Sequence, residues 1–590
     1  MALPCPKTNR QLKLKDRHIA FYLLCVIVAA WQCFVVALDT QLGGVGQMLH
    51  HWRVVAISLA NALLLLSPYW LLKRHWRWLV WIPMTLLTIW CLMQMCYCRA
   101  YDDLMPWQSL TLTQNVNSTL AASTVSLMRW QDLLVLVPYL LLIAVSLVWR
   151  RADHETARLK PFLLSLAGAL VLALVGYVVK GENYEKRFLY NFSNRDYFAQ
   201  NGLIPYGLFS LSEAVFNSHK VTDDERAMVD RFLADRCPHY SDNAYCHTQG
   251  RNLVLIIVES LHTWPIGMQV DGREVTPVIN RLVSGDSVIY APHVLFQTSH
   301  GHSSDAHFIY NTGLLPLRDG VVAVHHGDGP YPTLAAALSG YDCREIICTP
   351  GVNWNQSVTA RTYGFDSLYT RDHLAAALKR QANIDDAALI DFASGLLPTL
   401  RQPFFLEMVT MTMHAPYTDG KVPSTWINRS DTLNAEARGY LNCVHLTDSC
   451  IGVFIDALHR QGLSGNTIIA IVSDHTQLYR NRVMGLSDYD AVPDDWGIPL
   501  IIAGCDTTMR YEAVIGQIDV YPTLLDVMGA NAYPWKGLGH SILRYPVAGA
   551  IQPRNMSVIG DSTALTPHQR QAWDISRFLI FDRVSRFSMQ

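Results

Sequence analysis

Five long apolar runs dominate the first third of the sequence. Each run is about 17–20 residues long, and none contains Asp, Glu, Lys or Arg. A helix of that length crosses about 30 Å, which is the thickness of the hydrocarbon core of a bilayer. A single buried helix of a soluble protein can be equally apolar, but five in series predict membrane spans. The predicted spans are 19–38, 54–72, 78–97, 133–149 and 161–179.

Basic residues between these runs predict their orientation. The segment before the first run and the two even-numbered loops hold twelve Lys and Arg residues, whereas the two odd-numbered loops hold three. Basic loops stay on the cytoplasmic side, so we expect a cytoplasmic N-terminus and an extracytoplasmic chain after the fifth span. No small-residue cleavage site follows the first run, so we expect it to remain as an anchor.

The pattern changes to that of an α/β domain after residue 249. Short β-branched runs at 253–258, 404–409, 467–472 and 499–503 alternate with helical patterns, and this alternation predicts a mainly parallel central sheet. We therefore expect three parts: a transmembrane domain at 1–180, a juxtamembrane connector at 181–248, and an extracytoplasmic α/β domain at 249–590.

Composition agrees with a membrane protein and excludes one class of partner. Half of the residues are hydrophobic and only 16% are charged, which is unusually apolar for a soluble enzyme. The formal net charge is −2, so the chain lacks the basic excess of a nucleic-acid-binding protein. Nucleic acid is therefore not an expected partner.

Acidic and imidazole side chains follow three of the predicted strands. Glu259 follows the first strand, His414 ends the Thr410–His414 segment after the second, and Asp474 with His475 follows the third. Ligands of parallel sheets bind at the carboxyl ends of the strands. Each residue alone has an ordinary structural explanation, such as a surface ion pair or a helix cap. Together they are a ligand set for a divalent ion such as Zn²⁺ or Mn²⁺.

A short polar stretch at 297–308 contains the candidate nucleophile. It is crowded with hydroxyl and imidazole groups and precedes a predicted helix. A Ser/Gly/His turn that caps a helix is one interpretation of it. A hydroxyl held near a metal ion is the other, and Ser303 is then the nucleophile, with the neighbouring Ser304 as the alternative register.

The ordered set of motifs resembles the alkaline phosphatase/sulfatase superfamily. More narrowly, it resembles the membrane-anchored branch that contains lipoteichoic acid synthases and phosphoglycerol transferases, and the likeness covers nearly the whole chain. The motifs that carry it are Val258-Glu259-Ser260, Gly301-His302-Ser303-Ser304-Asp305-Ala306, Asn353-Trp354-Asn355, Thr412-Met413-His414-Ala415-Pro416-Tyr417, Ser473-Asp474-His475 and Gln517–Leu525.

The resemblance implies a fold, a site and a reaction. It implies a five-helix transmembrane domain followed by a sulfatase-like α/β domain with a mainly parallel sheet, in the cytoplasmic (inner) membrane of a bacterium. It implies one divalent ion, Mn²⁺ or Zn²⁺, and a phosphoglycerol or phosphoethanolamine group that moves from a phospholipid donor to an envelope glycan or lipid through a phosphoserine. The implied residues are catalytic Ser303 and His414, substrate-binding His302, Trp354 and Asn355, and metal ligands Glu259, Ser303, Asp474 and His475.

Three residues depart from the branch's pattern, and the third of them leaves the transferred group open. Ser303 stands where the nucleophile is usually Thr, His302 where those enzymes have Lys, and Gln356 where glycerol-phosphate polymerases have Arg. Loss of Arg removes a bidentate phosphate-binding group. The Cys/Ser-x-Pro-x-Arg motif of sulfatases proper is also missing from the nucleophile region, which argues against sulfate-ester hydrolysis. A phosphodiesterase with water as acceptor and a non-catalytic lipid sensor remain the alternative functions.

Overall fold

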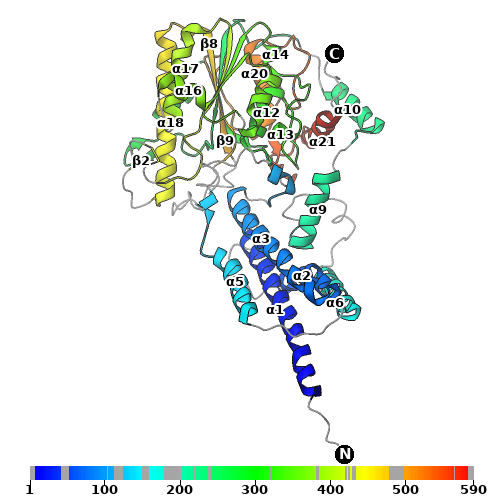
Figure 1. Ribbon diagram of the computed structural model, residues 1–590. Helices are drawn as coiled ribbons and strands as arrows, with labels where there is room; N and C mark the ends of the chain where they lie inside the picture. The colour runs from blue at the N-terminus through cyan, green and yellow to red at the C-terminus, as the bar shows by residue number, and fades with distance from the viewer. Residues whose placement is uncertain are drawn as a thin grey trace, which may run out of the picture. The chain divides into compact units, whose positions relative to one another are not determined.

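The computed structural model describes most of the chain (Figure 1). The chain forms two compact units, Met1–Trp107 with Ala122–Asn217, and Gln108–Ala121 with Ser218–Gln590. Residues 181–197 of the predicted connector lie outside the described part, and the three domain boundaries remain predictions. The described residues are 7–41, 52–101, 104–111, 124–148, 158–178, 198, 201–216, 220–236, 241–476 and 497–582, with gaps at 126, 319, 352, 380–383, 419–420, 423–425, 428–432, 554 and 564.

Apolar helices make up the first unit, as the sequence predicts. Ile19–Thr40, Trp52–Leu71 and Trp76–Arg99 are long and apolar enough to cross a membrane. The described apolar parts of the last two predicted spans, Asp132–Leu147 and Leu159–Leu174, are shorter, so the number of crossings stays a prediction. The helices of this unit are α1 (Lys7–Gln41), α2 (Trp52–Leu66), α3 (Trp81–Tyr101), α5 (Asp132–Val148), α6 (Leu159–Val178) and α9 (Leu203–Phe216).

A few buried polar contacts join these helices, while apolar side chains face outward. Gln32 on α1 donates its amide to the Thr88 hydroxyl on α3 (2.8 Å) and to the Val135 carbonyl on α5 (3.1 Å). Leu141 and Leu164, in contrast, are 60% and 72% exposed. Exposed leucines around a helix bundle with polar bonds inside it are typical of a lipid-facing surface.

The second unit is built on a mainly parallel nine-stranded sheet, which confirms the predicted α/β architecture. The strand order is β10-β4-β9-β8-β1-β7-β5-β6, and β11 also pairs with β4. Only β9 among the described strands of this sheet opposes its neighbours. The strands are β1 (Asn252–Val258), β4 (Val288–Leu295), β5 (Asp342–Ile347), β6 (Ser367–Tyr369), β7 (Phe404–Val409), β8 (Thr467–Ser473), β9 (Gly497–Ala503), β10 (Met509–Arg510) and β11 (Ile515–Gly516); the two ribbons are β2 (Gln269–Val270) with β3 (Arg273–Glu274), and β12 (Gly549–Ile551) with β13 (Val558–Gly560).

Helices cover both faces of this sheet (Figure 1). One face carries α16 (Arg371–Leu378), α17 (Asp386–Leu396) and α18 (Ala435–Arg460), and the other carries α12 (Ser303–Thr312), α13 (Val322–His325), α14 (Leu334–Ala337) and α20 (Val520–Met528). By length and hydropathy α18 is a fourth candidate span, but it packs on α17 within this unit. The remaining helices are α10 (Asp223–Arg236), α11 (Pro277–Val283), α15 (Gln356–Tyr363) and α21 (Thr566–Asp582).

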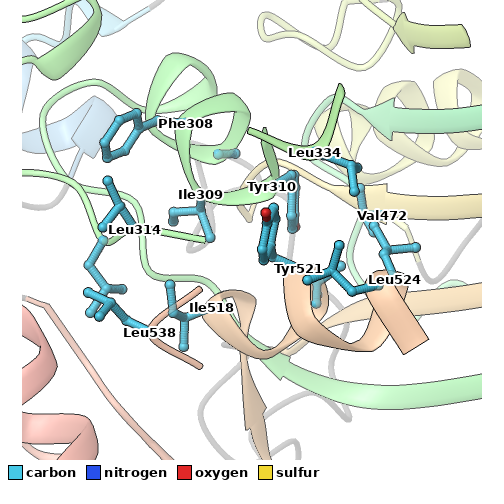
Figure 2. Close-up of a cluster of buried hydrophobic side chains, with 14 of the residues drawn as sticks. Phe308, Ile309, Tyr310, Leu314, Leu334, Val472, Ile518, Tyr521, Leu524 and Leu538 are labelled. Atoms are coloured by element: carbon cyan, nitrogen blue, oxygen red, sulfur yellow. The ribbon is translucent and has the colours of Figure 1, made fainter. Parts of the chain in front are cut away.

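Helix α12 is enclosed by the rest of the domain. Figure 2 shows Tyr310 of α12 beside Tyr521 and Leu524 of α20, and Phe308 of α12 beside Leu314. The Tyr310 hydroxyl also donates to the carbonyl of Ser473, at the end of β8 (2.6 Å). Helix α12 is therefore bound to the carboxyl end of β8.

We expect Gly313→Ala to destabilise the domain strongly. Gly313 ends α12 with φ 65°, and an added Cβ would lie 2.5 Å from the Gly537 Cα. Left-handed strain of about 1–2 kcal/mol and overpacking of about 1–3 kcal/mol together predict a loss of about 2–5 kcal/mol in the free energy of unfolding. Gly340→Ala is the control, because Gly340 has φ 89° with nothing within 4 Å of its added Cβ. Equal losses in chemical denaturation of the two full-length variants would contradict the close packing.

Candidate active site

Two acidic side chains and a histidine meet where β1 and β8 end. These strands are neighbours, and Val258 is in register with Ser473. Glu259 follows β1, and Asp474 and His475 follow β8, so the register places all three at one edge. All three are buried, and one ligand atom from each lies within 4.8 Å of the others.

Ser303 brings its hydroxyl to this group from the first position of α12. Its Oγ is 3.4 Å from Oε2 of Glu259 and 3.4 Å from Nε2 of His475. The Ser304 hydroxyl instead donates to the Gly301 carbonyl at 2.7 Å, inside the turn. Of the two neighbouring serines, Ser303 is therefore the one whose hydroxyl faces Glu259 and His475.

The spacing of these atoms fits ligands around one small cation. Ligands about 2.1 Å from a tetrahedral ion are about 3.4 Å apart, whereas charge-assisted hydrogen bonds are about 2.7–2.9 Å long. Oδ2 of Asp474 lies 3.5 Å from Nε2 of His475, and Oε1 of Glu259 lies 3.9 Å from it. Oδ2 of Asp474 is also buried with no hydrogen-bond partner in the described chain. The residues therefore fit a divalent ion such as Zn²⁺ or Mn²⁺.

Neighbouring groups orient these side chains. Nδ1 of His475 lies 2.7 Å from the Thr476 carbonyl, and a carbonyl only accepts, so Nδ1 carries the proton and Nε2 offers its lone pair. Ser260 donates its hydroxyl to Glu259 and its backbone N–H to Asp474, both at 2.7 Å. Ser260 adopts φ 52° to do so, a strained conformation that is common at functional sites.

Buried negative charge shifts the pKa values of Asp474 and His475. Burial and the charge of Glu259 raise the pKa of Asp474 to about 6. Burial lowers the pKa of His475, but the carboxylates of Asp474 and Glu259 outweigh it, so the net pKa is raised. A divalent cation offsets such charge directly.

Asp305 shapes the turn that carries Ser303. Its Oδ2 accepts the backbone N–H groups of Ser299 (2.8 Å) and Gly301 (3.0 Å). A Cβ on Gly301 would overlap this carboxyl group, so only glycine fits there. His302 completes the turn at φ 44°, and burial raises the pKa of Asp305 to about 7.

His414 follows β7 and is held as a neutral imidazole. Its Nδ1 lies 2.7 Å from the Ala415 carbonyl, which leaves Nε2 as the acceptor. Burial, and then the charge of Lys421, lower the pKa of His414 to about 4, and His475 and Asp474 also act on it. The Lys421 ammonium donates to the His414 backbone carbonyl. His414 is therefore a base near the proposed metal ligands at neutral pH.

The predicted substrate residues lie on a strained loop. Trp354 and Asn355 take φ 49° and 56° in succession, and the Asn355 amide holds the loop by donating to the Ala323 carbonyl (2.9 Å). The His302 ring links this loop to the group of proposed metal ligands. Its centroid lies 6.5 Å from the ring of Trp354 and 5.7 Å from the ring of His475. Their contact with substrate stays a prediction.

Gln356 is buried beside this loop, and its Oε1 accepts the Thr349 hydroxyl at 3.1 Å. The position where the resemblance leads us to expect Arg is therefore occupied by a neutral, internally bonded amide. Nothing at this residue supplies a charge for a phosphate.

The sequence interpretation missed Asp386 as a positioning group. It is fully buried, and its Oδ1 accepts the N–H groups of Met411 (2.7 Å) and Thr412 (3.0 Å), which orients the turn that ends at His414. An Asp at the start of a helix is ordinarily a solvent-exposed cap. Its partners lie 25 and 26 residues away, so no local spacing pattern could have revealed them.

Two family models cover most of the chain. Residues 251–530 match the sulfatase family, and residues 7–221 match the lipoteichoic acid synthase N-terminal domain. The first contains the site described above, and the second contains the apolar helices.

Individual relatives match over long stretches of the chain. The chain is 25% identical over 555 residues to the lipoteichoic acid synthase of Staphylococcus aureus, covering 88% of this chain and 83% of that one. Lipoteichoic acid synthase LtaP from Listeria monocytogenes matches with a TM-score of 0.51 and 19% identity, over 62% of this chain and 98% of that one. The integral membrane lipooligosaccharide phosphoethanolamine transferase A from Neisseria meningitidis matches with a TM-score of 0.51 and 14% identity, over 86% and 94%. At these identities the two solved structures show a common fold.

We expect His414→Gln to reduce acid destabilisation. A histidine kept neutral by burial binds its proton at higher pH in the unfolded chain than in the folded one, so folded stability falls from pH 6.5 towards about 4. Removal of this group should shrink that loss by roughly 1–3 kcal/mol. Chemical denaturation at several pH values measures it, with His293→Gln, at a 46%-exposed side chain, as control. Parallel pH profiles for wild type and His414→Gln would rule out a buried neutral His414.

Proposed function

We propose that the chain is a membrane-helix-containing transferase similar to the sulfatase superfamily, with an N-terminal domain similar to that of the lipoteichoic acid synthases. It moves a phosphoglycerol or phosphoethanolamine group from a phospholipid to an envelope glycan or lipid, through a phosphodiester on Ser303. One observation carries this proposal: the Ser303 Oγ lies 3.4 Å from both Glu259 and His475 at a helix N-terminus.

Ser303 acts as the nucleophile in the first step. Its Oγ attacks the phosphorus of the lipid headgroup, the new O–P bond forms, and the bond to the diacylglycerol oxygen breaks. A divalent ion held by Glu259, Asp474, His475 and Ser303 would supply the positive charge that lowers the hydroxyl pKa and polarises the phosphoryl group. The N-terminus of α12 adds backbone N–H groups that favour an anion.

His414 moves protons in both steps. Neutral imidazole at ordinary pH accepts the proton of the attacking hydroxyl and returns it to the leaving oxygen. In the second step an acceptor hydroxyl attacks the same phosphorus, its proton passes to His414, and the Ser303 oxygen leaves and is reprotonated. Diacylglycerol is the product of the first step, and the extended glycan or lipid is the product of the second.

Trp354, Asn355 and His302 form the substrate side of the proposed site. An aromatic wall excludes water from the phosphoryl group and contacts the headgroup. The names of the relatives include both a lipoteichoic acid synthase and a phosphoethanolamine transferase. The neutral Gln356 supports neither phosphoglycerol nor phosphoethanolamine over the other.

A membrane anchor supports transfer from lipid. We infer five crossings, a cytoplasmic N-terminus and a catalytic domain on the outer face of a bacterial cytoplasmic membrane, which is the orientation that the basic loops favour. A tethered site meets lipid headgroups at a high effective concentration. A sensor without catalysis would not need the complete ligand set.

We expect Ser303→Ala to abolish diacylglycerol release. The nucleophile has no substitute, so the rate should fall by at least about 10³-fold, which corresponds to about 4 kcal/mol of transition-state stabilisation. The assay uses the purified full chain in vesicles of phosphatidylglycerol or of phosphatidylethanolamine. The vesicle composition that supports release identifies the headgroup.

Two further variants serve as controls for Ser303→Ala, and the released product distinguishes a transferase from a hydrolase. Ser303→Thr keeps the hydroxyl and should keep measurable activity, whereas Ser304→Ala removes only a hydroxyl bonded to Gly301 and should change the rate less than about tenfold. Full activity of Ser303→Ala would refute the covalent route. Free headgroup phosphate accumulating without an acceptor would assign the site to a hydrolase instead.

A further inference from the structure

A second group of ionisable side chains lies inside the domain, apart from the Ser303 site. His307 is one helical turn after Ser303 on α12, Glu345 is on β5, and Glu407 is on β7. Glu345 and Glu407 are direct neighbours in the parallel register. The exposed fractions of the three residues are 4%, 2% and 0%.

Their distances are those of shared ligands and not of hydrogen bonds. Nδ1 of His307 lies 3.4 Å from Oε1 of Glu407 and 3.7 Å from Oε1 of Glu345. A charge-assisted hydrogen bond is about 2.7–2.9 Å long, and two ligands of a tetrahedral ion at about 2.1 Å are about 3.4 Å apart. All three ligand atoms lie within 4.8 Å of one another.

Several buried acceptors here have no donor. Oε2 of Glu345, Oε1 of Glu407 and Oδ1 of Asn311 are buried without a hydrogen-bond partner in the part of the chain that the structure describes. Asn311 is fully buried and donates Nδ2 to Oε2 of Glu407 at 2.8 Å, so its amide belongs to the same group. Buried acceptors without donors are rare and need an explanation such as an ion.

The lack of a basic partner for these carboxyl groups also favours a bound cation. No Lys or Arg pairs with Glu345 or Glu407 among the ion pairs of the described residues. As ionised ligands, Glu345 and Glu407 with a neutral His307 would carry a charge of −2, which one divalent cation would balance.

We propose that His307, Glu345 and Glu407 hold a second, internal divalent metal ion, with the Asn311 amide oxygen as a fourth ligand. Nitrogen and oxygen ligands in a closed buried site suit Zn²⁺, and Mn²⁺ is the next fit. The ion fastens α12 to β5 and β7, one turn from the serine at the helix start. Its role is structural, because no ligand reaches the surface.

Metal content per chain tests the proposal. The full chain is purified in detergent from cultures supplemented with Zn²⁺ or Mn²⁺, and inductively coupled plasma mass spectrometry counts the ions. Wild type should hold two ions, Glu345→Gln and Glu407→Gln one each, and Asp474→Asn one. Glu512→Gln, at a 58%-exposed side chain, is the matched control and should hold two.

Asp474→Asn decides the matter even where the internal variants fail to fold. When wild type holds two ions, one ion retained in that variant supports the internal site, and none retained overturns it. A single ion in wild type that Glu345→Gln and Glu407→Gln leave in place also overturns the internal site, while the site at Ser303 stands. A single ion lost on Glu345→Gln but kept on Asp474→Asn supports the internal site and instead removes the metal from Ser303.

Discussion

Negative charge buried at the ends of β1 and β8 is the constraint on which this domain depends. Glu259 and Asp474 are almost fully enclosed, and taking an ionised carboxylate out of water costs several kcal/mol unless a cation or hydrogen-bond donors offset it. Ser260 supplies two donors, and Oδ2 of Asp474 is left without one in the described chain. The buried carboxylates lower the stability of the fold at this position, but they also make it suitable for a cation. A bound cation would in turn attract a phosphoryl group.

Helix α12 places Ser303 beside this buried negative charge. Asp305 fixes the turn before it, Tyr310 binds it to the end of β8, and Gly313 ends it against Gly537. A helix enclosed on all sides has little freedom to move, and preorganised groups are what catalysis by a fixed nucleophile requires. His307 extends the arrangement inward, since it faces two more buried carboxylates from the next turn of the same helix.

Sequence patterns predicted the outline of this structure because its main signals are local. Apolar length predicted five helices of the first unit but not α9, and β-branched runs predicted the strands whose ends hold Glu259 and Asp474. The structure was needed to distinguish Ser303 from Ser304. The Ser304 hydroxyl donates to the Gly301 carbonyl, and a sequence pattern does not show this hydrogen bond. The opposite direction of β9 was equally hidden, since an apolar run does not record its direction.

Contacts between distant residues were beyond sequence reasoning. Asp386 looked like an ordinary helix start, yet it binds a turn 25 residues later. His307, Glu345 and Glu407 come from one helix and two strands, with no spacing that a motif could record. The length of the last two predicted spans is a different case, because residues 149–157 and 179–197 lie outside the described structure.

Peptide mass spectrometry of the acid-quenched protein tests the covalent role of Ser303 most directly. The full chain is incubated with phospholipid vesicles and no acceptor, digested, and the peptide containing Ser303 is fragmented. A headgroup phosphate attached to Ser303 is the expected result, and its mass identifies the group carried. Diacylglycerol release with an unmodified Ser303, or with the adduct on Ser304, would contradict the assignment of Ser303 as the residue that carries the phosphoryl group.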